Sequence, residues 1–146
     1  MASSPAKIRY VYDHWRPVTA IREADTDGND ATVADASWNS LQNTPAVSDY
    51  PSTQSIFSGA AAVVLARVLG TDQVSVVITS GPPLANIKRS FTTFSQAARE
   101  SADSRAYAGI HFRTACEDGL VLGRRIGARA AAMYLQPLPK GQTAAR

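Results

Sequence analysis

The feature that most constrains the fold is a row of small residues near the C-terminus. A helix is predicted from about residue 114 to 134, and small residues recur in it at four-residue intervals. Residues four apart lie on one helix face, so they form a smooth ridge. Each glycine inside a helix costs about 1 kcal/mol relative to alanine. The ridge therefore predicts a tight seam against another helix, rather than chance small residues in an alanine-rich segment. Its members are Gly119, Gly123, Gly127 and Ala131.

A partner for this seam is predicted between residues 51 and 70. Pro51 precedes the segment, and Ser52 or Thr53 can cap the first turn of a helix. The apolar run that follows has helical periodicity, and Gly70 is a natural stop. We therefore expect a long helix whose N-terminus carries two hydroxyl side chains.

The other segments complete a mostly helical prediction. Residues 6–16 read as a short helix that ends before Pro17, and residues 90–110 read as a longer helix. Residues 73–79 alternate and are β-branched, which is typical of a short strand. Residues 22–50 are polar, without helical period, and predict a long ordered loop. The predicted fold class is all-α, a small helical bundle with long loops.

Length and charge limit the classes of function. The 146 residues predict one domain over residues 1–136 and a flexible tail over residues 137–146. With 45% hydrophobic and 18% charged residues the chain can bury a core. A net charge of +3, with no block of five Lys or Arg, does not support nucleic acid as a partner.

The single cysteine and the N-terminus bear on the compartment. Cys116 has no second cysteine to pair with, so the chain is not a disulfide-stapled domain. No apolar run reaches the roughly 18 residues that span a bilayer. The first residues lack the apolar stretch of a signal peptide. The cytoplasm is the default expectation, and a secreted or periplasmic location stays open if a leader was removed.

Chemistry centres on one of the two histidines. His111 follows Arg105 in the stretch SRAYAGIHFR, and a turn at Gly109 would let both side chains face one pocket. A guanidinium and an imidazole converging on one point suit a tetrahedral oxyanion. The imidazole can attack the central atom of the anion or ligate it. His14 lies two residues from Arg16 and is interpreted as structural.

Two further elements favour an anion site. Arg9 and Arg16 are seven residues apart, about two helical turns, so they can share a helix face. By themselves they also fit an ordinary solvated face. The helix that begins near Ser52 adds free backbone N–H groups and the positive end of a helix dipole. Together these elements predict oxyanion binding.

The motifs R-x6-RP, PSTQ and SR-x5-H, which begin at residues 9, 51 and 104, resemble a known three-part signature. It is that of the vanadium-dependent haloperoxidases, K-x6-RP, PSxH and SR-x5-H. Type 2 phosphatidic-acid phosphatases and bacterial class A acid phosphatases share it. The flanking strings WRPVTAIR, LGTD, SFTTFSQAA and YAGIHFR resemble the bacterial haloperoxidase branch. The resemblance covers about residues 7–130.

The resemblance implies a role for each matching residue. Arg16 and Arg105 would hold equatorial oxygens of vanadate or phosphate, joined by the Ser52 hydroxyl and the Thr53 backbone N–H. His111 would be the axial vanadium ligand, or in a phosphatase the nucleophile that becomes a phosphohistidine. In haloperoxidases bound vanadate uses hydrogen peroxide to oxidise a halide to a hypohalous species, without a change in the oxidation state of vanadium.

Three positions depart from the family pattern. Arg9 stands where the family has Lys, and a guanidinium fork is not equivalent to an ammonium. Gln54 stands where the family has its acid–base His, and an amide does not titrate near neutral pH. Ala115 stands where an Asp often follows the last His, with Glu117 and Asp118 further along as uncertain replacements. We therefore expect reduced or absent turnover.

Three functions fit these residues. The first is vanadate-dependent halide oxidation, with hydrogen peroxide and a halide as partners. The second is hydrolysis of a small phosphate ester through His111. The third is a catalytically silent oxyanion-binding or assembly module. The first motif begins at residue 9, so the chain resembles the C-terminal part of the family. Exposed apolar faces would then need a missing N-terminal helical part or an identical chain as cover.

Overall fold

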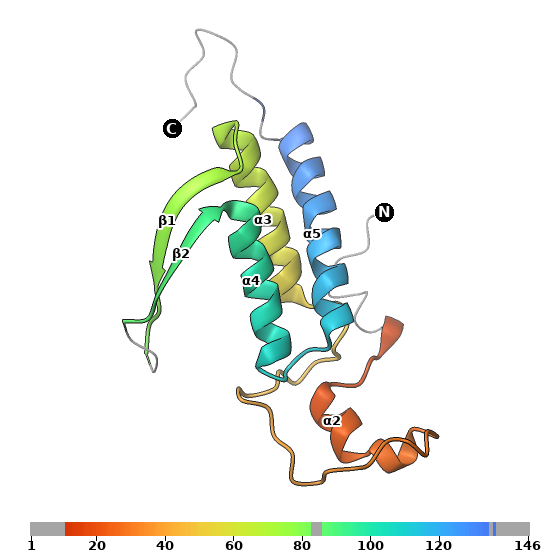
Figure 1. Cartoon of the computed structure of the whole chain (residues 1–146). Helices are drawn as coiled ribbons and strands as arrows, with labels where there is room; N and C mark the ends of the chain where they lie inside the picture. The colour runs from red at the N-terminus through yellow and green to blue at the C-terminus, as the bar shows by residue number, and fades with distance from the viewer. Residues whose placement is uncertain (1–10, 83–85, 135, 137–146) are drawn as a thin grey trace, which may run out of the picture.

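The computed structural model describes residues 11–82, 86–134 and 136 (Figure 1). Arg9, the first part of the predicted 6–16 helix (residues 6–10) and the predicted tail over 137–146 lie outside these residues. Three long helices run side by side, and a two-stranded hairpin extends from one end of them. The elements are α2 (Pro17–Arg22), the 3-10 helix η1 (Ala24–Thr26), α3 (Thr53–Leu69), β1 (Gln73–Thr79), β2 (Lys88–Thr93), α4 (Phe94–Tyr107) and α5 (Arg113–Met133).

The predicted glycine seam is confirmed as the contact between α3 and α5. A Cβ atom on Gly119 would lie 2.7 Å from the backbone oxygen of Ser52, and one on Gly127 would lie 2.6 Å from that of Ala60. A Cβ atom on Gly123 would overlap the backbone oxygen of Ile56. The two helix backbones therefore touch directly, which only glycine permits at these positions.

The remaining core lies on the other face of this helix pair, under α4. All of its buried members except Leu120 are small, which lets the three helices approach closely, and Phe94 and Ala106 pack against them. Because α3 and α5 run in one direction and α4 in the other, α3 and α5 begin at the end of the bundle where α4 finishes (Figure 1). The core cluster is Ala62, Ala98, Ala102, Cys116 and Leu120.

The hairpin connects α3 to α4. Gly70 ends α3 in the left-handed conformation at φ 73°, as predicted. The strand predicted over 73–79 is confirmed, and it pairs antiparallel with β2. The helix predicted over 90–110 is wrong at its start, because residues 90–93 belong to β2. Thr93 caps α4 by accepting a hydrogen bond from the Gln96 backbone N–H, so the helix begins only after it.

The prediction of a helix through residue 16 is also wrong. Asp13 has φ 40°, and Arg16 is the extended residue that precedes α2. Pro17 begins α2 instead of terminating a helix, because proline is well suited to a first helical turn. The polar loop over 22–50 is confirmed from residue 27 onward as turns and bends.

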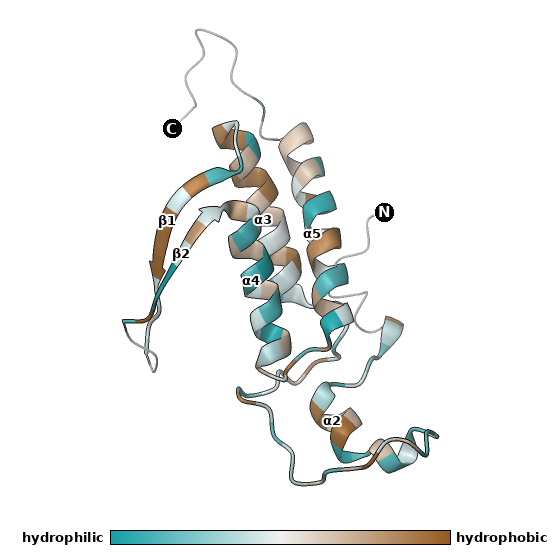
Figure 2. Ribbon diagram, viewed as in Figure 1, coloured by the Kyte–Doolittle hydropathy of each residue, from teal (hydrophilic) through white to brown (hydrophobic). Residues whose placement is uncertain are grey.

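Apolar residues also lie on the outside of the molecule (Figure 2). Val68 and Leu69 on α3 are 64% and 59% exposed, and Val77 and Ile78 on β1 are 56% and 52% exposed. Among the described helices none is long and apolar enough to cross a bilayer.

Candidate functional site

A cavity of about 410 Å³ opens at the end of the bundle where α3 and α5 begin. It brings together residues from all three sequence motifs, which are separated by about 35 to 95 positions in the chain. Two arginines and a histidine make it basic, and a proline and a phenylalanine add apolar surface. The lining residues are Arg16, Pro45, Thr53, Gln54, Phe57, Arg105 and His111.

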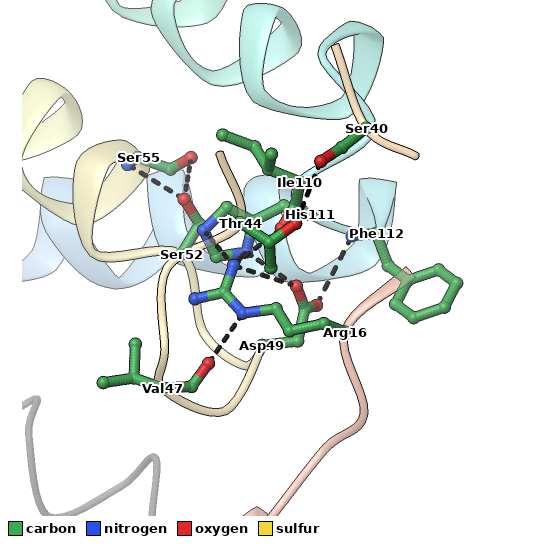
Figure 3. A network of polar contacts seen from close by, with 10 residues as sticks. All are labelled: Arg16, Ser40, Thr44, Val47, Asp49, Ser52, Ser55, Ile110, His111 and Phe112. Atoms are coloured by element: carbon green, nitrogen blue, oxygen red, sulfur yellow. Dashed lines mark hydrogen bonds and ion pairs between the residues drawn. The ribbon is translucent and has the colours of Figure 1, made fainter. Parts of the chain in front are cut away.

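Arg16 lines this cavity and is only 6% exposed. Its Nε donates to the backbone oxygen of Val47 at 2.7 Å, and Nη1 donates to that of Ile110 at 2.6 Å. Nη1 is also 3.1 Å from His111 Nε2 and 3.3 Å from Nδ1 (Figure 3). Arg16 therefore ties the 47–49 loop to the segment before α5, beside the imidazole.

Arg105 reaches the cavity from the last turn of α4. The chain then turns at Gly109, which has φ 72°, and this brings Ile110 and His111 back beneath the helix end. The predicted convergence of Arg105 and His111 is confirmed. Arg105 Nε is buried, and it has no hydrogen-bond partner among the described residues. A buried N–H of this kind is costly unless an acceptor meets it.

His111 is 5% exposed. Besides Arg16, its imidazole contacts an acidic residue that the sequence interpretation missed. Asp49, 1% exposed, places Oδ1 2.8 Å from His111 Nδ1. Asp49 Oδ2 accepts from the Phe112 backbone N–H at 3.4 Å, and Arg16 Nη1 is 3.6 Å from Oδ1. In the sequence, Asp49 is simply an acidic residue two positions before Pro51. No motif or spacing relates it to His111 in the third motif.

Asp118 was considered above as a replacement for the carboxylate that is missing at Ala115, but it contacts Tyr50 instead. Asp118 Oδ2 accepts from the Tyr50 hydroxyl at 2.9 Å, and this hydrogen bond raises the pKa of Tyr50. Ala115 contributes its backbone oxygen, which accepts from the Ser52 N–H at 2.9 Å. The carboxylate facing His111 therefore comes from Asp49 and not from α5.

The three residues predicted at the start of α3 do not all reach the cavity. Thr53 and Gln54 line the cavity and are exposed. Ser52 is fully buried and is the N-cap, and its Oγ accepts from the Ser55 backbone N–H at 3.4 Å and from Ser55 Oγ at 3.1 Å. Ser52 does not line the cavity, whereas the two residues that follow it do.

Cys116 lies behind these serines and is 1% exposed. Burial is the main cause that raises the pKa of its thiol. The sequence interpretation of a buried small side chain holds, since Cys116 belongs to the core cluster.

The donor set fits an oxyanion such as vanadate or phosphate. Two guanidinium groups, an imidazole and a helix N-terminus converge on the cavity, and one buried guanidinium N–H there has no partner within the described part of the chain. Among the described residues no group of three or more His, Cys, Asp or Glu side chains could hold a metal cation. The negatively charged side chain nearest to the imidazole, Asp49, is already in contact with cationic or N–H groups.

Fold and cavity together define a helical-bundle protein with a basic, partly apolar cleft. The VCPO second helical-bundle domain model matches residues 4–139. The chain therefore belongs to the vanadium-dependent haloperoxidase superfamily.

Solved structures agree with this assignment. A bacterial vanadium-dependent iodoperoxidase is 37% identical, with a TM-score of 0.73 over 86% of this chain and 28% of that protein. The holo and apo forms of a bacterial vanadium-dependent chloroperoxidase share the fold at 22% and 21% identity, with TM-scores of 0.70 and 0.73. They too match over 86% of this chain, which covers 31% and 32% of their lengths. A comparison with curated protein sequences gives no match.

Proposed function

We propose that the chain binds vanadate in the cavity at the start of α3 and supports halide oxidation by hydrogen peroxide. The observation that carries the proposal is Arg105 Nε, a buried N–H to which no described residue offers an acceptor, in a cavity that Arg105 shares with Arg16 and His111. An oxyanion would supply that acceptor and would be bound by charge-assisted hydrogen bonds. The 37% identity to an iodoperoxidase supports vanadate as this oxyanion.

Each cavity residue has a defined part in this proposal. Arg16 and Arg105 bind and orient the oxyanion, and the N–H groups at the start of α3 add the positive end of the helix dipole. His111 would be the residue that ligates the central atom. When bound, vanadate supplies the Lewis-acid centre at which hydrogen peroxide is activated toward a halide.

Gln54 limits the proposed activity. It lines the cavity and can hydrogen-bond an oxygen of the anion, but its amide neither accepts nor releases a proton near neutral pH. Because acid–base assistance typically contributes about 100- to 10,000-fold, binding should be better preserved than turnover. The chain spans about a third of the solved relatives or less, so the activity of a whole protein is part of the proposal.

Vanadate binding and turnover are tested separately. Binding is measured by isothermal titration calorimetry and by ⁵¹V NMR, and turnover by halogenation of an indicator phenol with hydrogen peroxide and iodide, bromide or chloride. His111→Ala should abolish halogenation and weaken vanadate binding. His14→Ala is the matched control, since His14 is exposed and does not line the cavity. A wild-type chain that binds neither vanadate nor phosphate would overturn the proposal.

A phosphatase is the second candidate, and the contact between Asp49 and His111 favours it. A carboxylate beside the distal imidazole nitrogen orients the ring and makes the other nitrogen a better nucleophile. Asp49 thus supplies a carboxylate of the kind that the family often has at the position of Ala115. Hydrolysis of a chromogenic phosphate ester without vanadate, lost in His111→Ala, would support it. Binding without turnover in either assay would identify a silent oxyanion-binding module.

A further inference from the structure

We infer that α5 binds the α5 helix of a second, antiparallel copy of this chain through the side that faces away from its glycine seam. This side is called here the outer face of α5. It does not line the cavity at the start of α3, so the inference goes beyond the proposed function and does not depend on it. The outer face is formed by Asp118, Val121, Leu122 and Arg125.

The outer face is exposed because α3 and α4 pack on the other side of α5 (Figure 1). At 3.6 residues per turn, each residue of a helix is rotated by about 100° from the one before. Val121 and Arg125 each lie two positions from Gly123, so their side chains point about 160° away from the seam. Val121 is 45% exposed, and Asp118 and Arg125 are exposed as well, whereas Gly123 is buried.

A groove of about 350 Å³ opens on the outer face, and all four residues of that face line it. Along α5 the carboxylate of Asp118 comes first, the two apolar side chains follow, and the guanidinium of Arg125 comes last. The other wall includes Tyr12 and Tyr50, which contact each other edge to face with ring centroids 5.2 Å apart. The groove therefore fits a helix that carries apolar side chains between charged ones.

The order of charges along α5 identifies that helix as α5 of a second copy. After its first residue, α5 has its acidic residues in the first half and its remaining basic residues in the second half. They are Glu117, Asp118, Arg124, Arg125 and Arg129. Two such helices have complementary charges when they lie antiparallel, whereas like charges meet when they lie parallel. An antiparallel pair related by a two-fold axis uses the same face of both copies.

The positions of the charges also give the register. With the two-fold axis between Val121 and Leu122, Asp118 of each copy faces Arg125 of the other, so the ion pair forms twice. Between the two ion pairs, Val121 and Leu122 of both copies bury apolar surface that is accessible in the single chain. Apolar burial then supplies affinity, and the charges determine the direction and register of the helices.

Both charged groups are suited to this contact. Asp118 Oδ2 accepts from the Tyr50 hydroxyl at 2.9 Å, which orders the carboxylate beside the groove and leaves it able to accept further hydrogen bonds. Arg125 forms no ion pair with any carboxylate in the described part of the chain. Because the carboxylate is already ordered, it loses less conformational entropy on binding than a mobile one would.

Sedimentation velocity measures the association. The interface is small, so we expect a dissociation constant of about 10–100 µM. Affinity should fall with added salt, because salt screens the two ion pairs. A wild-type chain that stays monomeric at about 500 µM in low salt would overturn the inference, as it would if a different protein covered this face.

Two charge reversals test the register by complementation. Asp118→Arg and Arg125→Glu each set like charges against each other at both contacts, so each should weaken self-association at least about 10-fold. An equimolar mixture restores opposite charges at both contacts and should form a heterodimer. Arg99→Glu on α4 is the matched control, because Arg99 is exposed and lies outside the outer face. Unchanged self-association of Arg125→Glu would overturn the inference. A mixture that stays monomeric, with both variants folded by circular dichroism, would overturn it too.

A disulfide cross-link keeps the inference testable if a charge variant does not fold. Val121→Cys places a thiol of each copy beside the two-fold axis, so mild oxidation should link two chains through this position. Ser75→Cys, at an exposed position of β1, is the control and should link far fewer chains. Equal cross-linking of the two variants at one protein concentration would show that the outer face of α5 is not the interface.

Discussion

Gly123 on α5 packs directly onto the backbone carbonyl of Ile56 on α3, leaving no room for a side chain between the two helices. This contact determines where the site lies, as well as how the bundle packs. It holds the first turn of α3, with Thr53 and Gln54, beside the start of α5, which begins two residues after His111. The cavity is therefore built on a rigid helix pair.

The first prediction concerns this seam. Gly123→Ala should lower the free energy of unfolding by about 3 kcal/mol, because overpacking of this kind typically costs about 1–3 kcal/mol and here the obstacle is backbone. Urea unfolding followed by circular dichroism measures the change. Gly81→Ala is the matched control, since a Cβ atom there meets nothing within 4 Å. Equal stability of the two variants would show that α3 and α5 can separate at no cost.

The seam was the most predictable part of the fold. Small residues at four-residue spacing indicate close packing of one helix on another. The structure shows this close packing at Gly119, Gly123 and Gly127. The convergence of Arg16, Arg105 and His111 was predictable for a different reason, because their motifs have fixed internal spacing. The 90–110 helix was wrong at its start because residues 90–93 pair with β1, a contact with no local signal.

The second prediction concerns Gln54. Gln54→His should raise any vanadate-dependent halogenation rate by about 100-fold or more, because acid–base assistance typically contributes about 100- to 10,000-fold. Vanadate affinity should change far less, since Gln54 lines the cavity but carries no charge. Initial rates with an indicator phenol provide the measurement, and Gln96→His on α4 controls for an added imidazole elsewhere. Unchanged rates would mean that the site lacks more than this one group.

Asp49 and the details around Arg16 could not be predicted. Asp49 meets His111 across 62 positions of chain, and no spacing rule joins an acid before Pro51 to a histidine before α5. Arg16 was predicted on a helix face with Arg9, but it precedes α2 and donates to the carbonyls of Val47 and Ile110. Every residue has a backbone carbonyl, so the residue types do not indicate which carbonyls Arg16 will meet. Tertiary structure determines that.

The third prediction concerns Arg105. Arg105→Lys should weaken vanadate and phosphate binding at least about 10-fold, because a lysine cannot place a planar fork of donors where Nε now lies. Calorimetric titration with each anion measures the loss. Arg99→Lys is the matched control on the same helix, since Arg99 is exposed and lies outside the cavity. A similar affinity for both variants would remove Arg105 from the anion site.

The fourth prediction concerns Cys116. Its thiol is 1% exposed, and burial raises its pKa, so little thiolate is present at neutral pH. In native conditions a thiol reagent such as DTNB should therefore react at least about 100-fold more slowly than in 6 M guanidinium chloride. Ser75→Cys, at an exposed position of β1, gives the fast-reacting reference. Rapid modification of the native wild-type chain would contradict the packing of α5 against α3 and α4.

The fifth prediction concerns Tyr50 and alkaline pH. The hydrogen bond to Asp118 is the main cause that raises the pKa of Tyr50 above its ordinary value of 10.0. A group whose pKa is raised by folding stabilises the folded state below its unfolded pKa and loses that contribution as pH rises through the folded pKa. Tyr50→Phe should therefore cost about 1 kcal/mol at pH 8, and this difference from wild type should shrink above pH 10. Urea unfolding across this pH range measures it, with Tyr134→Phe as the exposed control. A difference that stays constant through alkaline pH would show that Tyr50 acts by packing alone.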